Sequence, residues 1–113
     1  MIDALISGRL RGAVTPRTTG AGKPFAVWRV ATTDKNGDSV LCSCIAFSQT
    51  AIEAAQRLTD GDSIAVSGEA AISTWQGNDG AARHGLDVLV HGVLTAYHLG
   101  RKRKGNDTER GEL

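Results

Sequence analysis

The chain has 113 residues, of which 41% are hydrophobic and 22% charged, and this composition is typical of one compact domain. No apolar run approaches the roughly 18 to 20 residues that a membrane helix needs, and the N-terminal stretch lacks a signal-peptide cleavage pattern. We therefore expect a cytoplasmic protein without a membrane-spanning segment. Cys42 and Cys44 are too few and too close for a disulfide scaffold or a four-ligand zinc site, so reduced, structural thiols are expected.

The charge distribution limits how the chain can bind nucleic acids. Lys and Arg number 13 against 12 Asp and Glu, which gives a formal net charge of +1. The excess of basic residues lies in residues 99–113, so the rest of the chain is close to neutral. Phosphate-driven affinity comes from Lys and Arg that displace condensed counterions. Any nucleic-acid binding by residues 1–98 must therefore rely on local basic patches or on base stacking.

Five segments have the alternating, β-branched pattern of strands. They are residues 2–13, 25–34, 39–47, 63–75 and 83–98. The connections at 15–24 and 76–80 are rich in Gly and polar residues and predict mobile loops. Between the second and third strands, Asn36-Gly37 predicts a tight hairpin turn, because these residue types accept the positive φ angles that such a turn requires.

Residues 48–62 interrupt the alternation and predict one short helix. Their apolar residues follow helical spacing: Ala51, Ile52, Ala54, Ala55 and Leu58. Thr50 and Glu53 form a predicted capping box, and Gly61 is expected to end the element.

This order of elements predicts an all-β fold, a five-stranded Greek-key barrel of the OB type with one short helix between the third and fourth strands. Closure of the barrel would remove the sheet edges that such a chain otherwise exposes. A sandwich capped by the helix is the alternative. Residues 1–98 form the predicted domain, and residues 99–113, which contain almost no apolar side chains, are predicted to be a disordered tail.

Trp75 lies out of phase with the apolar face of its strand. Ile64 and Val66 have even numbers, whereas Trp75 is odd, as is Ser67, so the indole belongs to the polar face. An indole exposed beside the Gly-rich segment 76–80 predicts a stacking surface for a nucleic-acid base, worth about 1–3 kcal/mol per base. The alternative is an indole covered by a loop or by another subunit.

Two further aromatic residues are candidates for stacking. The small Cys42 and Cys44 suit the tight interior of a small barrel, which places Phe47 on the outer face. Packing beneath the following helix is the alternative for Phe47. Either face of the strand that contains Trp28 is suitable for the core, so a core or subunit contact and a stacking role stay equally open for Trp28.

Basic side chains near the connections are candidates for phosphate contacts. Arg9 and Arg11 share one face of the first strand, a spacing that can follow consecutive backbone phosphates. The other candidates lie in or beside the predicted loops: Arg17, Lys23, Lys35 and Arg83. The basic run at 101–104 either adds nonspecific affinity or is a solvated tail.

Catalytic and metal-binding patterns are poorly represented. His84, His91 and His98 are spaced so that they alternate between the faces of a strand and do not converge on a metal ion. Neither a nucleophile elbow nor an HExxH or P-loop motif occurs in the sequence. We expect a protein that is not an enzyme and that holds no metal or cofactor.

Over residues 4–97 the chain resembles the bacterial single-stranded DNA-binding protein family. The resemblance is carried by ISGRL at 6–10, WRVATTDKNGD at 28–38 and CIAFSQTAIEAAQRLTDGDSIAVSGEAAISTWQGNDG at 44–80. The last stretch is the most specific, because it joins a strand ending in Phe, a helix, a Gly-Asp turn, a Val-Ser-Gly strand and a Trp before a Gly-rich loop. The resemblance implies an OB fold, self-association as a dimer or tetramer, and sequence-independent binding of single-stranded DNA.

The resemblance also assigns roles to individual residues. Phe47 and Trp75 fall on positions that stack bases in the family, and Arg9 on a basic position of the first strand. The chain departs from the family at Leu41, where a stacking Trp is frequent, and after Thr33, where another aromatic residue is often found. The stretch before Trp75, basic in many members, has no basic residue here. Fewer aromatic and basic side chains predict weaker or more salt-sensitive binding.

The C-terminal residues depart further from the family pattern. Members that organise replication and repair typically end in a long linker and an acidic tip finishing in Pro-Phe, which partner enzymes bind. This chain ends in Arg110-Gly111-Glu112-Leu113, so recruitment by that route is not expected. A short relative, such as the dimeric primosomal replication protein or a copy carried by a mobile element, fits the length better.

Sequence-independent protection of single-stranded DNA in replication, recombination or repair is thus the expected function. One alternative is an oligomeric OB-fold adaptor that binds DNA weakly and mainly contacts other proteins, such as those of replication restart. Another is an RNA-binding OB domain, which would use the same stacking physics.

Overall fold

The computed structural model of the protein describes residues 1–95, with the side chain of Ala82 left aside. It contains five strands and one short helix. In chain order these are β1 (Ile2–Thr18), β2 (Pro24–Thr33), β3 (Ser39–Ala46), α1 (Gln49–Gln56), β4 (Ser63–Gln76) and β5 (Ala82–Thr95). The predicted end of the last strand at residues 96–98 and the predicted tail at 99–113 lie outside the described residues.

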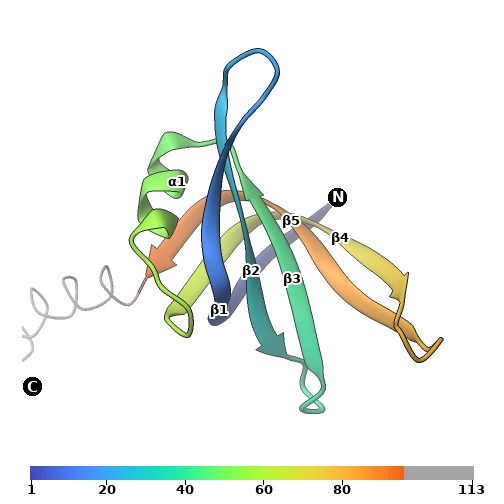
Figure 1. Ribbon diagram of the computed structural model, residues 1–113. Coiled ribbons are helices and arrows are strands. Elements are labelled where there is room, and N and C mark those ends of the chain that lie inside the picture. The colour runs from blue at the N-terminus through green and yellow to red at the C-terminus, as the bar shows by residue number, and fades with distance from the viewer. Residues whose placement is uncertain (96–113) are drawn as a thin grey trace, which may run out of the picture.

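The strands close into a barrel in the order β1-β2-β3-β5-β4, and β4 pairs back with β1 (Figure 1). Neighbouring strands are antiparallel except for β3 and β5, which run parallel. Closure pairs the backbone groups that an open sheet would leave at its edges. The predicted OB-type barrel is confirmed, and the alternative of a helix-capped sandwich is wrong.

The even-numbered side chains of β2 and β3 fill the interior of the barrel. Strand side chains alternate between two faces, and the buried residues of β2 and β3 are Ala26, Trp28, Val30, Cys42, Cys44 and Ala46. The inward phase predicted from Cys42 and Cys44 is therefore confirmed. It follows that the odd-numbered side chains of β3, and those that pair with them on β2 and β5, face outward.

The first hairpin is longer than the sequence predicts. A loop was expected over residues 15–24, but β1 continues to Thr18 and pairs with β2 from Thr15 onward, after a bulge and a positive φ of 81° at Gly12. Pro16 is compatible with this strand because the second half of β1 pairs with β2 alone, so that the missing N–H faces a free edge. Only residues 19–23 form the turn.

Helix α1 is shorter than predicted and begins differently. Its N-cap is Ser48, without a side-chain capping hydrogen bond, so the predicted capping box of Thr50 and Glu53 is wrong. Glu53 instead accepts a hydrogen bond from Nε2 of Gln49, at 3.0 Å, within the helix. The helix ends at Gln56, well before Gly61, which adopts a φ of 91° in the turn leading to β4. Within the described residues no helix has the length and apolar character to span a membrane.

The turn between β2 and β3 is present but uses one positive φ angle rather than two. Gly37 has a φ of 85°, whereas Asn36 does not enter the left-handed region. The carboxylate of Asp34 accepts the backbone N–H groups of Asn36 and Asp38, at 2.8 and 3.1 Å. This side-chain contact stabilises the turn, so a second left-handed residue is not required.

Gly68 provides a test of this packing, because it lies beside the bulge where β4 meets β5. A Cβ at this position would overlap the backbone carbonyl of Leu89. We expect Gly68→Ala to lower the free energy of unfolding by about 1–3 kcal/mol, measured by urea denaturation. Gly20→Ala is the control, because no atom lies within 4 Å of its added Cβ. Equal stability of the two variants would contradict the register of β4 and β5.

Candidate nucleic-acid interface

The outward face of β3 forms the centre of a continuous surface across the barrel. Its residues have defined neighbours on both sides. Leu41 lies between Ala31 and Gly85, Ser43 between Arg29 and Asp87, and Ile45 between Val27 and Leu89. Side chains from β2, β3 and β5 are therefore brought onto one face by strand register alone.

A groove of about 860 Å³ lies on this face, and we call it the outer groove. Its floor includes the apolar side chains of Val27, Ile45 and Leu89. Arginines from β1 and β2 lie on one side, namely Arg11, Arg17 and Arg29, and carboxylates from β4 and β5 lie on the other, namely Glu69 and Asp87. The outer groove is thus electrostatically polarised across its width, with an apolar floor between a cationic and an anionic side.

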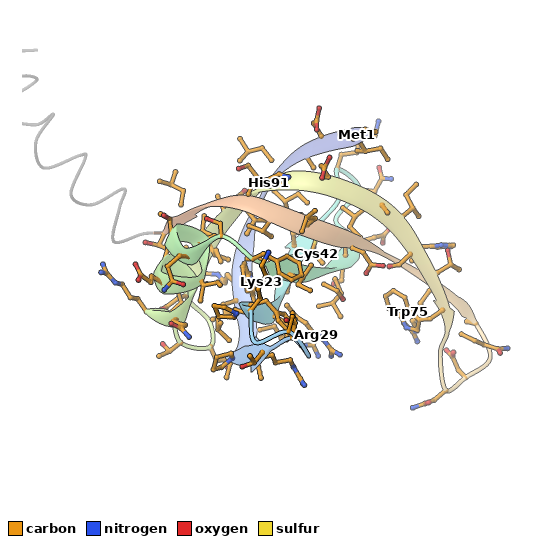
Figure 2. The ribbon with its side chains drawn as sticks, turned by 90° about the horizontal axis from the view of Figure 1, so that it is seen from above. Met1, Lys23, Arg29, Cys42, Trp75 and His91 are labelled. Carbon is orange, nitrogen blue, oxygen red and sulfur yellow. The ribbon has the colours of Figure 1, made fainter. Side chains whose placement is uncertain are left out.

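Trp75 lies beyond one end of the outer groove, on the arm formed by β4 and β5 (Figure 2). Its side chain is 42% exposed, as the strand phase predicts. A Cβ at Gly85 would lie 3.0 Å from two carbons of the indole, so the ring rests on this glycine. Gly85 is a residue that the sequence analysis missed; it pairs with Ser73 and is therefore the diagonal neighbour of Trp75 on the next strand.

Phe47 lies beyond the other end, directly after β3, and is 49% exposed. Its ring stacks on that of Phe25, with centroids 5.5 Å apart and an interplanar angle of 30°. At about 3.3 Å per residue, the distance along β3 from Leu41 to Phe47 is about 20 Å. Leu41 is the neighbour of Gly85, so the two exposed aromatic surfaces flank the outer groove at its opposite ends.

Trp28 is in the core and not on the surface. Its side chain is 3% exposed, and it shares the inward face of β2 with Ala26 and Val30. The sequence left both faces of this strand open, because apolar residues occupy positions of both parities. The closed barrel resolves the choice, since Trp28 pairs with the buried Cys44. A ring that is 3% exposed offers almost no surface to a base, so its burial does not support the predicted stacking role of Trp28.

Of the predicted cations, Arg11 and Arg17 line the outer groove, and Arg29 joins them. Arg11 and Arg29 are direct neighbours across β1 and β2. Within residues 1–95 none of the three guanidinium groups has a hydrogen bond or ion pair. Arg29 was missed as a site residue because its strand face was left undecided; once Trp28 points inward, Arg29 must point outward.

Arg9 differs from this group in its contacts. Arg9 and Arg11 pair with Ala31 and Arg29 in unbroken register, so both lie on one face of β1, as the sequence predicts. Nη1 of Arg9 donates a hydrogen bond to the carbonyl of Gly61, at 3.0 Å, and Arg9 does not line the outer groove. Of the predicted pair, only Arg11 therefore reaches the outer groove.

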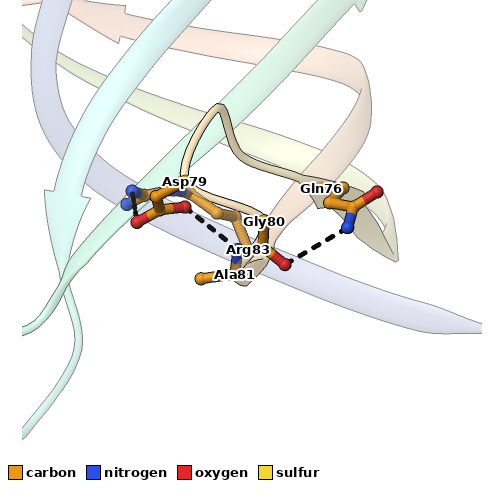
Figure 3. A network of polar contacts seen from close by, with 5 residues as sticks. All are labelled: Gln76, Asp79, Gly80, Ala81 and Arg83. Atoms are coloured by element: carbon orange, nitrogen blue, oxygen red, sulfur yellow. Dashed lines mark hydrogen bonds and ion pairs between the residues drawn. The ribbon is translucent and has the colours of Figure 1, made fainter.

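The remaining cations lie at the hairpin tips. Lys23 ends the turn between β1 and β2, and Lys35 lies in the turn between β2 and β3, both exposed. Arg83 forms an ion pair with Asp79 at 3.3 Å across the tip of the β4–β5 hairpin (Figure 3). Asp79 also accepts a hydrogen bond from the backbone N–H of Ala81, which stabilises the turn. The same carboxylate partly neutralises the charge of Arg83.

The cysteines provide no reactive group to this surface. Burial raises the pKa of Cys42, and burial together with the neighbouring Cys42 raises the pKa of Cys44 to about 12. Both thiols are free and buried. At neutral pH they stay protonated, and a thiol is a poor nucleophile compared with a thiolate.

Comparison with known proteins agrees with this architecture. A single-stranded DNA-binding protein of Clostridium perfringens (strain 13 / Type A) is 38% identical over 56 residues, which are 50% of this chain and 37% of that protein. The chain thus covers well under two thirds of that relative's length.

Two crystal structures share the fold. The small single-stranded DNA-binding protein of Streptomyces coelicolor superposes with a TM-score of 0.66 at 22% identity, over 83% of this chain and 93% of that one. The mitochondrial single-stranded DNA binding protein Rim1 of S. cerevisiae gives a TM-score of 0.63 at 17% identity, over 84% and 94%. Residues 1–105 match the model of the Single-strand binding protein family, and the chain belongs to that family.

Proposed function

We propose that this chain binds single-stranded DNA along the outer groove, with bases stacked on Trp75 and Phe47 and phosphates held by Arg11, Arg17 and Arg29. The observation that carries the proposal is the pair of exposed aromatic surfaces at opposite ends of one groove. Every base has a π-face, so stacking of this kind tolerates any sequence. Membership of the family and the name of the Clostridium relative support the same reading.

The polarity of the outer groove determines how a strand would lie in it. Phosphates are attracted to the arginine side, formed by β1 and β2, and repelled from Glu69 and Asp87 on β4 and β5. The backbone therefore follows the arginines, and the bases extend over the apolar floor. Lys23 and Lys35, in the turns at opposite ends of β2, would add longer-range attraction.

Replacing the exposed indole tests the stacking role. We expect Trp75→Ala to weaken binding of a dye-labelled dT oligomer by about fivefold to 150-fold in fluorescence anisotropy, because one stacked base is worth about 1–3 kcal/mol. Ile72→Ala is the matched control, since Ile72 is 71% exposed on the opposite face of the same strand. Light scattering of each free variant verifies that the assembly is unchanged. Equal affinities of Trp75→Ala and wild type would remove Trp75 from the interface.

Replacing the arginines tests the phosphate contacts. Each of Arg11→Ala, Arg17→Ala and Arg29→Ala is expected to reduce the slope of log affinity against log salt by about 0.7, the amount associated with one phosphate of a single strand. Arg57→Gln, outside the outer groove at the end of α1, is the charge control and should leave the slope unchanged. If the arginine variants and the control have the same slope as wild type, the backbone does not follow this side of the groove.

We further propose that the chain self-associates through the outer face of β1, β4 and β5. Leu5 is 78% exposed and Leu94 is 44% exposed. Leu5 pairs with Ser67 and Leu94 pairs with Ala65, so the two leucines lie on either side of β4, offset by two residues along it, on one outward surface. Large apolar side chains gathered on one surface are typical of a protein interface. A dimer or tetramer built in this way would leave the outer groove open.

The proposed activity is binding without catalysis, in the cytoplasm, in support of DNA replication, recombination or repair. The alternative is an adaptor that mainly contacts proteins such as those of replication restart. The arginines on one side of a groove between two exposed aromatic surfaces support DNA binding, because single-stranded DNA offers both phosphates for the arginines and bases for the rings. Competition between matched DNA and RNA strands distinguishes an RNA-binding role.

A further inference from the structure

The anionic side of the outer groove is not explained by attraction to phosphate. It contains two carboxylates in different situations. Glu69 is bound by Nε2 of His91, at 3.3 Å. Asp87 is exposed and has no hydrogen bond or ion pair within residues 1–95. Asp87 is therefore the carboxylate available to a molecule that lies in the groove.

The neighbours of Asp87 leave space beside it. Across β3 its neighbour is Ser43, and across β4 it is Ala71, both small and exposed. Arg29 lies on the far side of Ser43, two strand spacings or about 10 Å away. A nucleotide whose phosphate contacts Arg29 and whose ring lies over Ser43 thus directs its base edge toward Asp87.

An ionised carboxylate accepts hydrogen bonds and donates none. In a single strand, the Watson–Crick edge of a base is free to be read. Guanine presents two adjacent donors there, N1–H and the 2-amino group, which match the two oxygens of a carboxylate. Thymine presents a single N–H between two carbonyl oxygens, which a carboxylate repels. Asp87 therefore discriminates between bases that stacking alone would treat alike.

We propose that Asp87 makes the outer groove selective for guanine over thymine. The inference rests on the proposed binding of single-stranded DNA and adds base preference to it. Asp87 also repels the phosphates of any strand in the groove. For a strand of thymines no hydrogen bond to Asp87 offsets this repulsion, so its affinity is lowered. Removing the charge therefore has opposite consequences for the two bases: thymine strands gain affinity, and guanine loses its advantage.

The experiment compares three dye-labelled strands of equal length by anisotropy at one salt concentration. The first contains only thymine, the second has isolated guanines among thymines, and the third has inosine, which lacks the 2-amino group, at the same positions. For wild type we expect the guanine strand to bind about fivefold tighter than the thymine strand, the amount expected for about 1 kcal/mol of hydrogen bonding. The inosine strand should fall between them.

The variant Asp87→Asn is expected to bind the thymine strand more tightly than wild type does and to bring the guanine and inosine strands to the same affinity. Glu53→Gln is the charge control, because Glu53 is exposed on α1 and outside the outer groove; it should keep the wild-type guanine preference. Thermal melting of both variants verifies folding, and the strand comparison on wild type does not depend on either variant.

The outcomes separate the inference from the proposed function. If wild type binds all three strands with equal affinity, the selectivity of Asp87 is overturned while DNA binding stands. If Asp87→Asn keeps the guanine preference, another residue provides it and the inference is again overturned. If wild type binds no strand at all, the proposed function fails and the inference fails with it.

Discussion

The structure depends on the alternation of side chains along the strands of a closed barrel. Small, even-numbered residues such as Cys42, Cys44 and Ala46 fit the narrow interior, and a shift by one residue would bring Ser43 and Ile45 inward instead. In a closed barrel each strand is paired on both sides and cannot rotate about its own axis. The packing of the core therefore also determines which side chains reach solvent. The outer groove is therefore a consequence of how the core is packed.

The strand phase was enough to predict the two exposed aromatic residues. In the strand segments that contain Trp75 and Phe47 one face is clearly suited to the core, and both aromatic side chains belong to the other face. It was not enough for Trp28 and Arg29, whose strand has apolar residues on both faces; only pairing with Cys44 decides between them. The start of α1 was also missed, because Ser48 and Thr50 are both good capping residues and local sequence does not rank them.

Contacts between strands were missed for a different reason, because they depend on register and on strand order. The β4–β5 hairpin pairs Trp75 with Arg83 and Ser73 with Gly85, which places Gly85 diagonally across from the indole that it supports. The polarity of the outer groove likewise arises from strand order: β1 and β2 contribute arginines, and β4 and β5 contribute carboxylates. A nearly neutral chain thus obtains a cationic surface by separating its charges in space rather than by adding basic residues.

Amide NMR of the labelled protein during titration with a dT oligomer shows whether single-stranded DNA lies along the outward face of β3. We expect the largest shifts on Leu41, Ser43 and Ile45 and on the indole N–H of Trp75. If the shifts instead concentrate around Leu5 and Leu94, on the surface proposed for self-association, the DNA does not lie in the outer groove.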